Sequence, residues 1–306
     1  AVVKLHVDFL RSQFTGLHHR CHVERLIDPE GAFAIAHRRR QLDLGPFFQI
    51  ASQLLAELGV TEAAVGCPVR ASVDVVEIGT IESGLPVYID RIASAADGIV
   101  VINRIKTHTA FHADYESGLV KMLAIGLGND IGAKSCHQLG FGKMAENIVA
   151  MTRLKLAKLP VLFGVAVIED GAENVSIIEV VDADRILERE PELLKISKSY
   201  MPSIGLSQID VLVVDRMGKE ISGDGMDPNI TGRYATPYAS GGPDITRLAV
   251  LSATEETHGN VIGVGQAQVW SRQSVDRQPA LAVASYAYLL LAALRVYGIN
   301  ERGPVI

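Results

Sequence analysis

The sequence is poor in the features that mark secreted and nucleic-acid-binding proteins. Its 306 residues hold three cysteines, Cys21, Cys67 and Cys136, without C-x-x-C pairing. Cysteines that are few, odd in number and scattered along the chain build no disulfide framework and are typical of a reducing compartment. Its 29 basic and 35 acidic residues give a net charge of −6. This balance lacks the strong basic excess typical of nucleic-acid-binding proteins, so we expect no nucleic-acid partner.

Long uncharged apolar stretches are lacking as well. The longest runs over Ala280–Leu294 and is followed by Arg295. A membrane-spanning helix needs about 20 such residues, so this stretch predicts a buried helix and no membrane partner. The hydrophobic content of 48% and the charged content of 21% are ordinary for a globular protein. We expect a cytoplasmic protein and leave a homo-oligomer open.

Apolar runs alternate with helical patterns along most of the chain, which is typical of parallel α/β architecture. Strands are predicted over 87–89, 98–102, 161–168, 175–181 and 210–215, and helices over 46–58, 119–125, 144–159 and 183–200. The pattern leaves open whether Pro191 divides the helix over 183–200 in two.

The predicted fold class is therefore α/β, with two α/β domains whose parallel-type sheets surround an interdomain cleft. We place an N-terminal domain at 1–205 and a C-terminal domain at 206–306. The sequence leaves open whether the second domain is complete.

The segment from Asn103 to Gln138 carries the densest set of reactive side chains and begins where a predicted buried strand ends. Ligands of open α/β sheets bind beyond the carboxyl ends of the strands. His108 lies there, and histidine can transfer protons in both directions near neutral pH. A surface or packing role is the alternative for any single histidine.

Lys121 lies within an apolar stretch, after the small residues Ser117 and Gly118. Partial burial would favour its neutral, nucleophilic amine, while the alternative is an ammonium that reaches the surface. His137 follows a glycine-containing turn over 126–132 and could bind a metal, whereas Cys136 is better suited to packing.

A second glycine-rich loop, over 215–233, also follows a predicted strand. Lys219 or Arg233 in this loop could hold a substrate carboxylate, and the alternative is a polar connection. Two such loops from two domains predict a cleft for a small molecule.

Together these stretches resemble the lactate racemase family, a group of isomerases that depend on a nickel-pincer cofactor. The resemblance covers roughly residues 50–270. The motifs that carry it are Lys106-Thr-His108, Glu116-Ser-Gly-Leu-Val-Lys121-Met and Gly218-Lys219-Glu-Ile-Ser-Gly.

This resemblance implies a racemase or epimerase of a 2-hydroxy acid that uses a nickel-bearing pyridinium nucleotide bound through a thioamide to a lysine. Lys121 matches the tether, beside Ser117 and Gly118, and His137, sixteen residues later, matches the nickel ligand. His108 matches a catalytic histidine that takes the hydroxyl proton, while hydride passes to the cofactor. Lys219 is similar to a lysine that helps to hold the substrate.

The family's second catalytic histidine, in a Gly-His turn upstream, has no counterpart in this sequence. Two alternatives therefore stay open. One is a zinc hydrolase that uses His108, His112 and His137, although the H-E-x-x-H glutamate is lacking. The other is a non-catalytic homologue that binds a metabolite or nucleotide.

Overall fold

The computed structural model describes residues 2–3, 56, 59–70, 72–257 and 263–270. The helix predicted over 46–58 lies outside these residues except for Ala56, and the apolar stretch over 280–294 lies outside them entirely.

The chain forms two compact units. The first unit comprises residues 1–107 and 113–201, and the second comprises 108–112 and 202–306. A five-residue segment from the first half of the sequence is therefore built into the second unit. The domain division at 205/206 did not foresee this segment and stays a prediction.

The first unit is built on a four-stranded sheet with the order β1-β4-β5-β6. β4 pairs in parallel with β1 and with β5. Ile99, Val100 and Val101 of β4 are buried, as predicted from their continuous apolar run. The strands are β1 (Val2–Val3), β4 (Ile99–Arg104), β5 (Val161–Glu169) and β6 (Val175–Asp182).

The expectation of parallel-type sheets is wrong for two pairs of strands in this unit. β6 runs antiparallel to β5, and β2 (Val75–Thr80) runs antiparallel to β3 (Pro86–Asp90). A parallel connection needs a crossover of a dozen or more residues. Only a tight turn joins β5 to β6, and Asp170 Oδ1 stabilises it by accepting hydrogen bonds from the backbone N–H groups of Ala172 and Asn174. The architecture is mixed α/β with small sheets.

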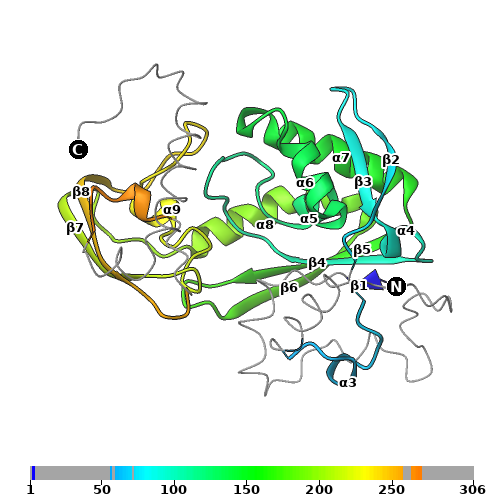
Figure 1. Ribbon diagram of the computed structural model, residues 1–306, viewed down its shortest axis with the longest axis horizontal. Helices are drawn as coiled ribbons and strands as arrows, with labels where there is room; N and C mark the ends of the chain where they lie inside the picture. The colour runs from blue at the N-terminus through cyan, green and yellow to red at the C-terminus, as the bar shows by residue number, and fades with distance from the viewer. Residues whose placement is uncertain (1, 4–55, 57–58, 71, 258–262, 271–306) are drawn as a thin grey trace. The chain divides into compact units, whose positions relative to one another are not determined.

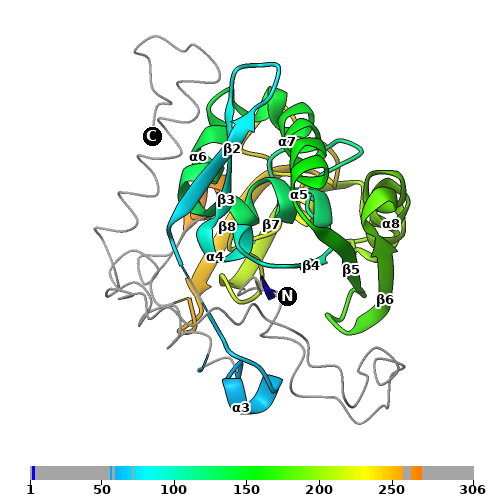
Figure 2. The same ribbon diagram turned by 90° about the vertical axis from the view of Figure 1, so that its right-hand side faces the viewer.

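Helices α5, α7 and α8 lie on one face of this sheet, as the two ribbon views agree (Figures 1 and 2). α5 approaches β5 closely because Gly164 has no side chain, and a Cβ there would lie 2.5 Å from Leu119 Cδ1. The helices of this unit are α3 (Glu62–Val65), α4 (Arg91–Ser94), α5 (Leu119–Ala124), α6 (Asn129–His137), α7 (Met144–Lys158) and α8 (Ile186–Tyr200).

α8 is one continuous helix despite Pro191 in its interior. Proline has no N–H to donate, so it leaves the carbonyl four residues earlier, that of Leu187, without its helical partner. The Tyr115 hydroxyl donates to this carbonyl at 2.6 Å. A side chain from a distant loop thus satisfies the backbone group that Pro191 frees.

The glycine-containing turn expected over 126–132 is only partly a turn. A short 3-10 helix covers Gly126–Gly128, and α6 begins at Asn129, so Gly132 is helical. Glycine disfavours a helix interior, which is why the sequence pattern suggested a turn. In the structure, a Cβ on Gly132 would lie 3.8 Å from Tyr88 Cβ, so this position faces β3.

The second unit contains a parallel sheet with the order β7-β8-β9. β7 (Gln208–Met217) extends the strand predicted over 210–215, while β8 (Asp244–Ala253) and β9 (Val269–Trp270) had no sequence prediction. The core of this unit includes Leu248 and Val250 of β8, with Met217 at the end of β7.

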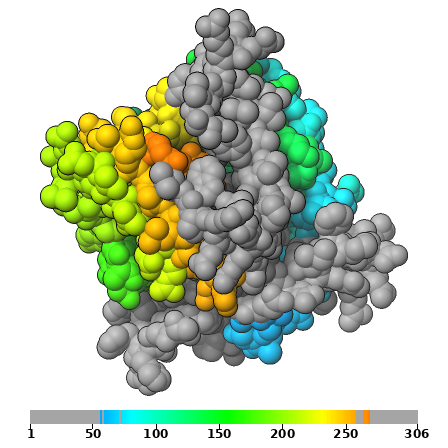
Figure 3. Space-filling model, turned by 60° about the vertical axis from the view of Figure 1, so that its left-hand side comes forward, coloured from blue at the N-terminus to red at the C-terminus, as the bar shows by residue number. Residues whose placement is uncertain are grey.

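β7 and β8 also reach the surface in the space-filling view, in yellow-green and orange (Figure 3). Val211, Val213 and Leu251 on these strands are exposed apolar residues. Within the described residues of both units, no helix is long and apolar enough to cross a membrane.

Candidate functional site

Lys121 lies in the middle of the short helix α5. The other five residues of α5 are buried, and Lys121 is half-buried. The helix therefore packs its apolar side chains inward and leaves one position at the boundary with solvent. Such a place suits a lysine that must be shielded and still be reached by a reagent.

The N-terminus of α5 is capped by a buried carboxylate from another helix. Glu190 of α8 accepts a hydrogen bond from the Val120 N–H at 2.8 Å. Burial raises the pKa of Glu190 to about 7, against the lowering effect of hydrogen bonds from the Val120 and Leu119 backbone. A negative charge at this helix end is favourable because the first N–H groups of a helix carry partial positive charge.

Gly118 makes room for this cap. A Cβ at Gly118 would lie 2.6 Å from Glu190 Cδ and 2.7 Å from Ile105 Cδ1. The φ of Gly118 is −178°, so glycine is required here by space and not by backbone strain. The structure thus gives Gly118 a packing reason of its own, while the cofactor-binding role predicted for it stays a prediction.

The C-terminus of α5 meets a charge of the opposite sign. Lys155 of α7 is fully buried, and its Nζ donates to the Ala124 carbonyl at 3.2 Å. A cation is favourable there because the last carbonyl groups of a helix carry partial negative charge. α5 is therefore held at both ends by buried ionisable side chains, and Lys121 lies between them.

His137 is the last residue of α6 and is exposed. Its Nδ1 lies 2.7 Å from the Ala133 carbonyl oxygen. A carbonyl oxygen only accepts, so the neutral ring carries its proton on Nδ1 and has its lone pair on Nε2. Histidines that bind metals usually donate their other ring N–H to a carbonyl or carboxylate in this way. His137 is therefore oriented as a metal ligand would be.

Cys136 lies next to His137 and is close enough to Lys121 to be affected by its charge. Burial raises the pKa of its thiol to about 11, while the positive charges of Lys121 and Lys155 act in the opposite direction. Its Sγ contacts Met144 Sδ at 3.6 Å. The packing role expected for Cys136 is therefore confirmed, and the charge of Lys121 acts on the residue next to His137.

His108 and His112 belong to the second unit and lie in an irregular segment. Asn229 connects them. Its Oδ1 lies 2.8 Å from His112 Nε2, and its Nδ2 donates to the His108 carbonyl at 3.3 Å. Asp227 holds this asparagine by accepting from its Nδ2 at 2.9 Å. The sequence alone singled out neither residue, because Asn229 meets the two histidines, and Glu190 meets Val120, only across 70 or more residues of chain.

Ser117 and Lys219 lie in loops next to regular elements of the two units. Ser117 forms a single antiparallel bridge with Lys106 before α5 begins. Lys219 lies in the turn after β7, and its backbone N–H donates to Thr257 Oγ1 at 3.2 Å. The predicted site residues thus divide between the units: Ser117, Gly118, Lys121 and His137 are in the first, and His108 and Lys219 are in the second.

Arg233, the other residue considered for a substrate carboxylate, is engaged with the backbone. Its guanidinium donates to the carbonyls of Ile245 and Thr246. This leaves Lys219 as the better candidate of the two within the second unit.

Among the described residues, no group of three or more His, Cys, Asp or Glu side chains is arranged to hold a metal ion. A zinc hydrolase needs three protein ligands, so the described residues give that alternative no support. A nickel-pincer nucleotide would need fewer protein ligands for its metal, because its own thioamide and thiocarboxylate groups would contribute donors. One oriented histidine and one accessible lysine fit such a group.

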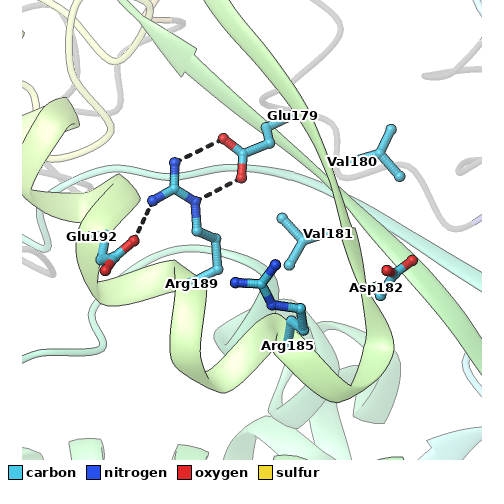
Figure 4. Close-up of a pocket in the computed structure, with 7 residues that line it drawn as sticks. All are labelled: Glu179, Val180, Val181, Asp182, Arg185, Arg189 and Glu192. Carbon is cyan, nitrogen blue, oxygen red and sulfur yellow. Dashed lines mark hydrogen bonds and ion pairs between the residues drawn. The ribbon is translucent and has the colours of Figure 1, made fainter.

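The first unit also has a polar surface hollow of about 280 Å³, formed by β6 and α8 (Figure 4). Arg189 lies within it and donates to Glu179 from Nε at 2.7 Å and also to Glu192. These hydrogen bonds raise the pKa of Arg189 and lower that of Glu179. Because its guanidinium is already paired with two carboxylates, Arg189 is not available for a substrate anion, and the hollow shares no residue with the predicted site.

No protein-family model matches the chain, and no curated protein matches it. Among solved structures, the chain is similar to the lactate racemase apoprotein from Thermoanaerobacterium thermosaccharolyticum, with a TM-score of 0.39 and 16% sequence identity. The similarity covers 65% of this chain and 49% of that chain, so this chain spans about half the length of that protein. A likeness this distant does not assign the chain to a family.

Proposed function

We propose that this protein is an isomerase that racemises or epimerises a 2-hydroxy acid with a nickel-pincer nucleotide. The orientation of His137 carries the proposal, because its Nδ1–H is held by the Ala133 carbonyl and its Nε2 is left to bind a metal. The motif around Lys121, which resembles the tether sequence of the lactate racemase family, supports it independently.

Within the first unit, Lys121 would hold the nucleotide through a thioamide and His137 would bind its nickel. The fixed ends of α5 support the first role, since Glu190 and Lys155 hold the helix on which Lys121 lies. A fixed backbone limits the positions that a tethered group can take. When bound, the nucleotide supplies a hydride acceptor, and the protein supplies orientation and proton management.

Residues of the second unit would act on the substrate. His108 would interact with its hydroxyl group, and Lys219 with its carboxylate. The ammonium of Lys219 has no recorded partner within the described part of the chain, so a carboxylate would meet an available cation. The partner is therefore a small 2-hydroxy acid.

The decisive experiment is intact-protein mass spectrometry of the full chain, produced together with the enzymes that make the cofactor. We expect a mass increase that maps to Lys121 and one nickel per chain by elemental analysis. Lys121→Ala should abolish the adduct, whereas Lys134→Ala should not, because Lys134 is an exposed lysine paired with Asp130. Zinc without an adduct, or an adduct that survives Lys121→Ala, would overturn the proposal.

A second measurement separates the tether from the metal ligand. His137→Gln should keep the adduct on Lys121 and lose the nickel, because glutamine lacks the imidazole lone pair. His112→Gln serves as the matched control and should keep both, since His112 lies in the other unit. Retention of nickel by His137→Gln would show that His137 is not the ligand.

A further inference from the structure

His108 and His112 are four residues apart in the same unit, yet their ring nitrogens are engaged in opposite ways. His108 Nδ1 accepts a hydrogen bond from the Ala110 N–H at 2.9 Å. His112 uses its Nε2, which faces Asn229 Oδ1 at 2.8 Å. These hydrogen bonds decide which nitrogen carries the proton in each neutral ring.

The amide of Asn229 can have only one orientation. Its Nδ2 lies near two groups that only accept, the Asp227 carboxylate at 2.9 Å and the His108 carbonyl at 3.3 Å. Its Oδ1 also accepts from the Tyr234 hydroxyl at 3.1 Å. The atom that faces His112 is therefore the oxygen, so His112 Nε2 must carry a proton and donate it.

In neutral His112 the lone pair is consequently on Nδ1. Among the described residues, no hydrogen-bond partner is recorded for this nitrogen. The ring is half-buried and packs edge-on against Tyr234, with centroids 5.5 Å apart. The backbone is fixed as well, since the His112 N–H donates to the Tyr238 carbonyl at 2.8 Å. His112 is thus a rigidly held imidazole with a basic nitrogen directed away from its anchor.

Neutral His108 is in the opposite situation. Its Nδ1 lone pair is occupied by the Ala110 N–H, so its proton is on Nε2. To gain a second proton on Nδ1, the ring would have to break that hydrogen bond. To accept a proton on Nε2, it would first have to lose the one it holds. His108 is therefore arranged as a hydrogen-bond donor and not as a proton acceptor.

We propose that His112 is the group that takes and returns the substrate's hydroxyl proton, through Nδ1, and that His108 is a neutral hydrogen-bond donor to the substrate. This inference rests on the proposed function and reassigns the proton chemistry within it. A neutral histidine that polarises an oxygen is an established catalytic device.

The step balances with one base. The hydroxyl O–H bond breaks, its proton goes to His112 Nδ1, and its electron pair forms the C=O bond of a 2-keto acid. The Cα–H bond would break at the same time, and the hydride would leave with its electron pair to the acceptor that a bound nucleotide would supply. Return of the hydride to the other face of the keto acid, with return of the same proton from His112, would give the opposite configuration. A single proton-transfer histidine therefore suffices for this step.

The tautomers can be measured without cofactor, on the full chain labelled with ¹⁵N. In long-range ¹H–¹⁵N spectra above neutral pH, we expect both His108 and His112 to carry the proton on Nε2. Asn229→Leu should shift His112 toward a mixture of tautomers, while Tyr234→Phe, which removes a different partner of Asn229, should not. A proton on Nδ1 of His112 in the unaltered protein would overturn the inference.

Glutamine substitutions then separate proton transfer from hydrogen bonding, because the glutamine amide donates but does not accept a proton. In protein that carries the Lys121 adduct, His112→Gln should lower racemisation by roughly 10²- to 10⁴-fold, the usual contribution of a general base. His108→Gln should cost less, because it keeps a donor, and His108→Ala should cost more than His108→Gln.

The outcomes distinguish the two proposals. An adduct with nickel, together with near-normal racemisation by His112→Gln, would overturn the role of His112 and leave the proposed function standing. Absence of any adduct would overturn the proposed function and the catalytic role of His112 with it, while the ¹⁵N spectra would still decide the tautomers.

Discussion

At the scale of single residues, the neighbourhood of Lys121 depends on a carboxylate that no local pattern reveals. Glu190 is 2% exposed and caps α5 through the backbone of Val120. A buried carboxylate is costly unless it is hydrogen-bonded or protonated. With a pKa of about 7, Glu190 is close to the balance between its ionised and its protonated form at neutral pH.

This balance predicts a pH-dependent stability. Burial raises the pKa of Glu190 from 4.5 to about 7, so the folded state binds a proton more tightly than the unfolded state. The favourable contribution is complete below about pH 4.5 and is lost as the pH rises toward 7, by an amount on the order of 3 kcal/mol. Glu190→Gln should remove this dependence, as measured by the free energy of unfolding in urea at a series of pH values between 4.5 and 8.

The difference in unfolding free energy between wild type and Glu190→Gln reports on Glu190 alone, because all other groups titrate in both proteins. Parallel curves for wild type and Glu190→Gln over this range would show that the carboxylate does not titrate there.

A second residue-scale prediction concerns Gly118. Gly118→Ala should destabilise the protein by roughly 1–3 kcal/mol, because the added methyl group would collide with Glu190 and Ile105. Gly223→Ala is the matched control, since a Cβ there meets nothing within 4 Å. Urea unfolding measures both, and equal effects of the two substitutions would contradict the packing argument.

At the scale of elements, α8 shows how a distant side chain keeps a helix intact. The carbonyl of Leu187 has lost its helical donor to Pro191 and accepts from Tyr115 instead. Tyr115 precedes α5 in the chain, so this hydrogen bond joins the loop before α5 to the helix that caps it.

Tyr115→Phe should therefore cost about 1–3 kcal/mol, because it leaves a partly buried carbonyl without a donor. Pro191→Ala restores an N–H at the right position, so the double variant should lose much less than Tyr115→Phe alone. A double-mutant cycle from urea unfolding measures this coupling. Additive effects would show that the hydroxyl does not replace the missing helical donor.

The element scale also shows why the sheets were only partly predictable. Apolar runs identified β4 and β7. The buried half of β4 agrees with the burial that such a run predicts, whereas β7 exposes Val211 and Val213. They gave no direction for β6, since direction depends on the length of the connection from β5 and on the turn that Asp170 stabilises. α6 was missed because Gly132 is a poor helix former, and the packing of α6 against β3 cannot be read from local sequence.

At the scale of the whole molecule, the chain enters the second unit twice. Residues 108–112 are held there by hydrogen bonds from Thr236 to the Ala110 carbonyl and from Asn229 to the His108 carbonyl. The connection between α8 and β7 has an exposed leucine, Leu206, at 61% exposure.

Brief chymotrypsin treatment should cut after Leu206, because exposed connections are the preferred sites of proteolysis. The two fragments should still elute together in gel filtration without denaturant, since residues 108–112 of the first fragment belong to the second unit. Thr236→Val, which removes one of the hydrogen bonds to this segment, should weaken the association. Separation of the wild-type fragments under native conditions would contradict the discontinuous unit.

The sequence by itself determined the chemical inventory: a histidine after a buried strand, a lysine in an apolar helix and a second histidine sixteen residues later. These features are local, because they depend on residue type, spacing and apolar periodicity. Only the tertiary structure decided how the side chains are held. The Asn229 amide fixes the proton of His112 from 117 residues away, and Glu190 caps α5 from 70 residues away. Hydrogen-bond partners, and the protonation states that follow from them, arise when distant segments pack together, so no spacing along the chain can specify them.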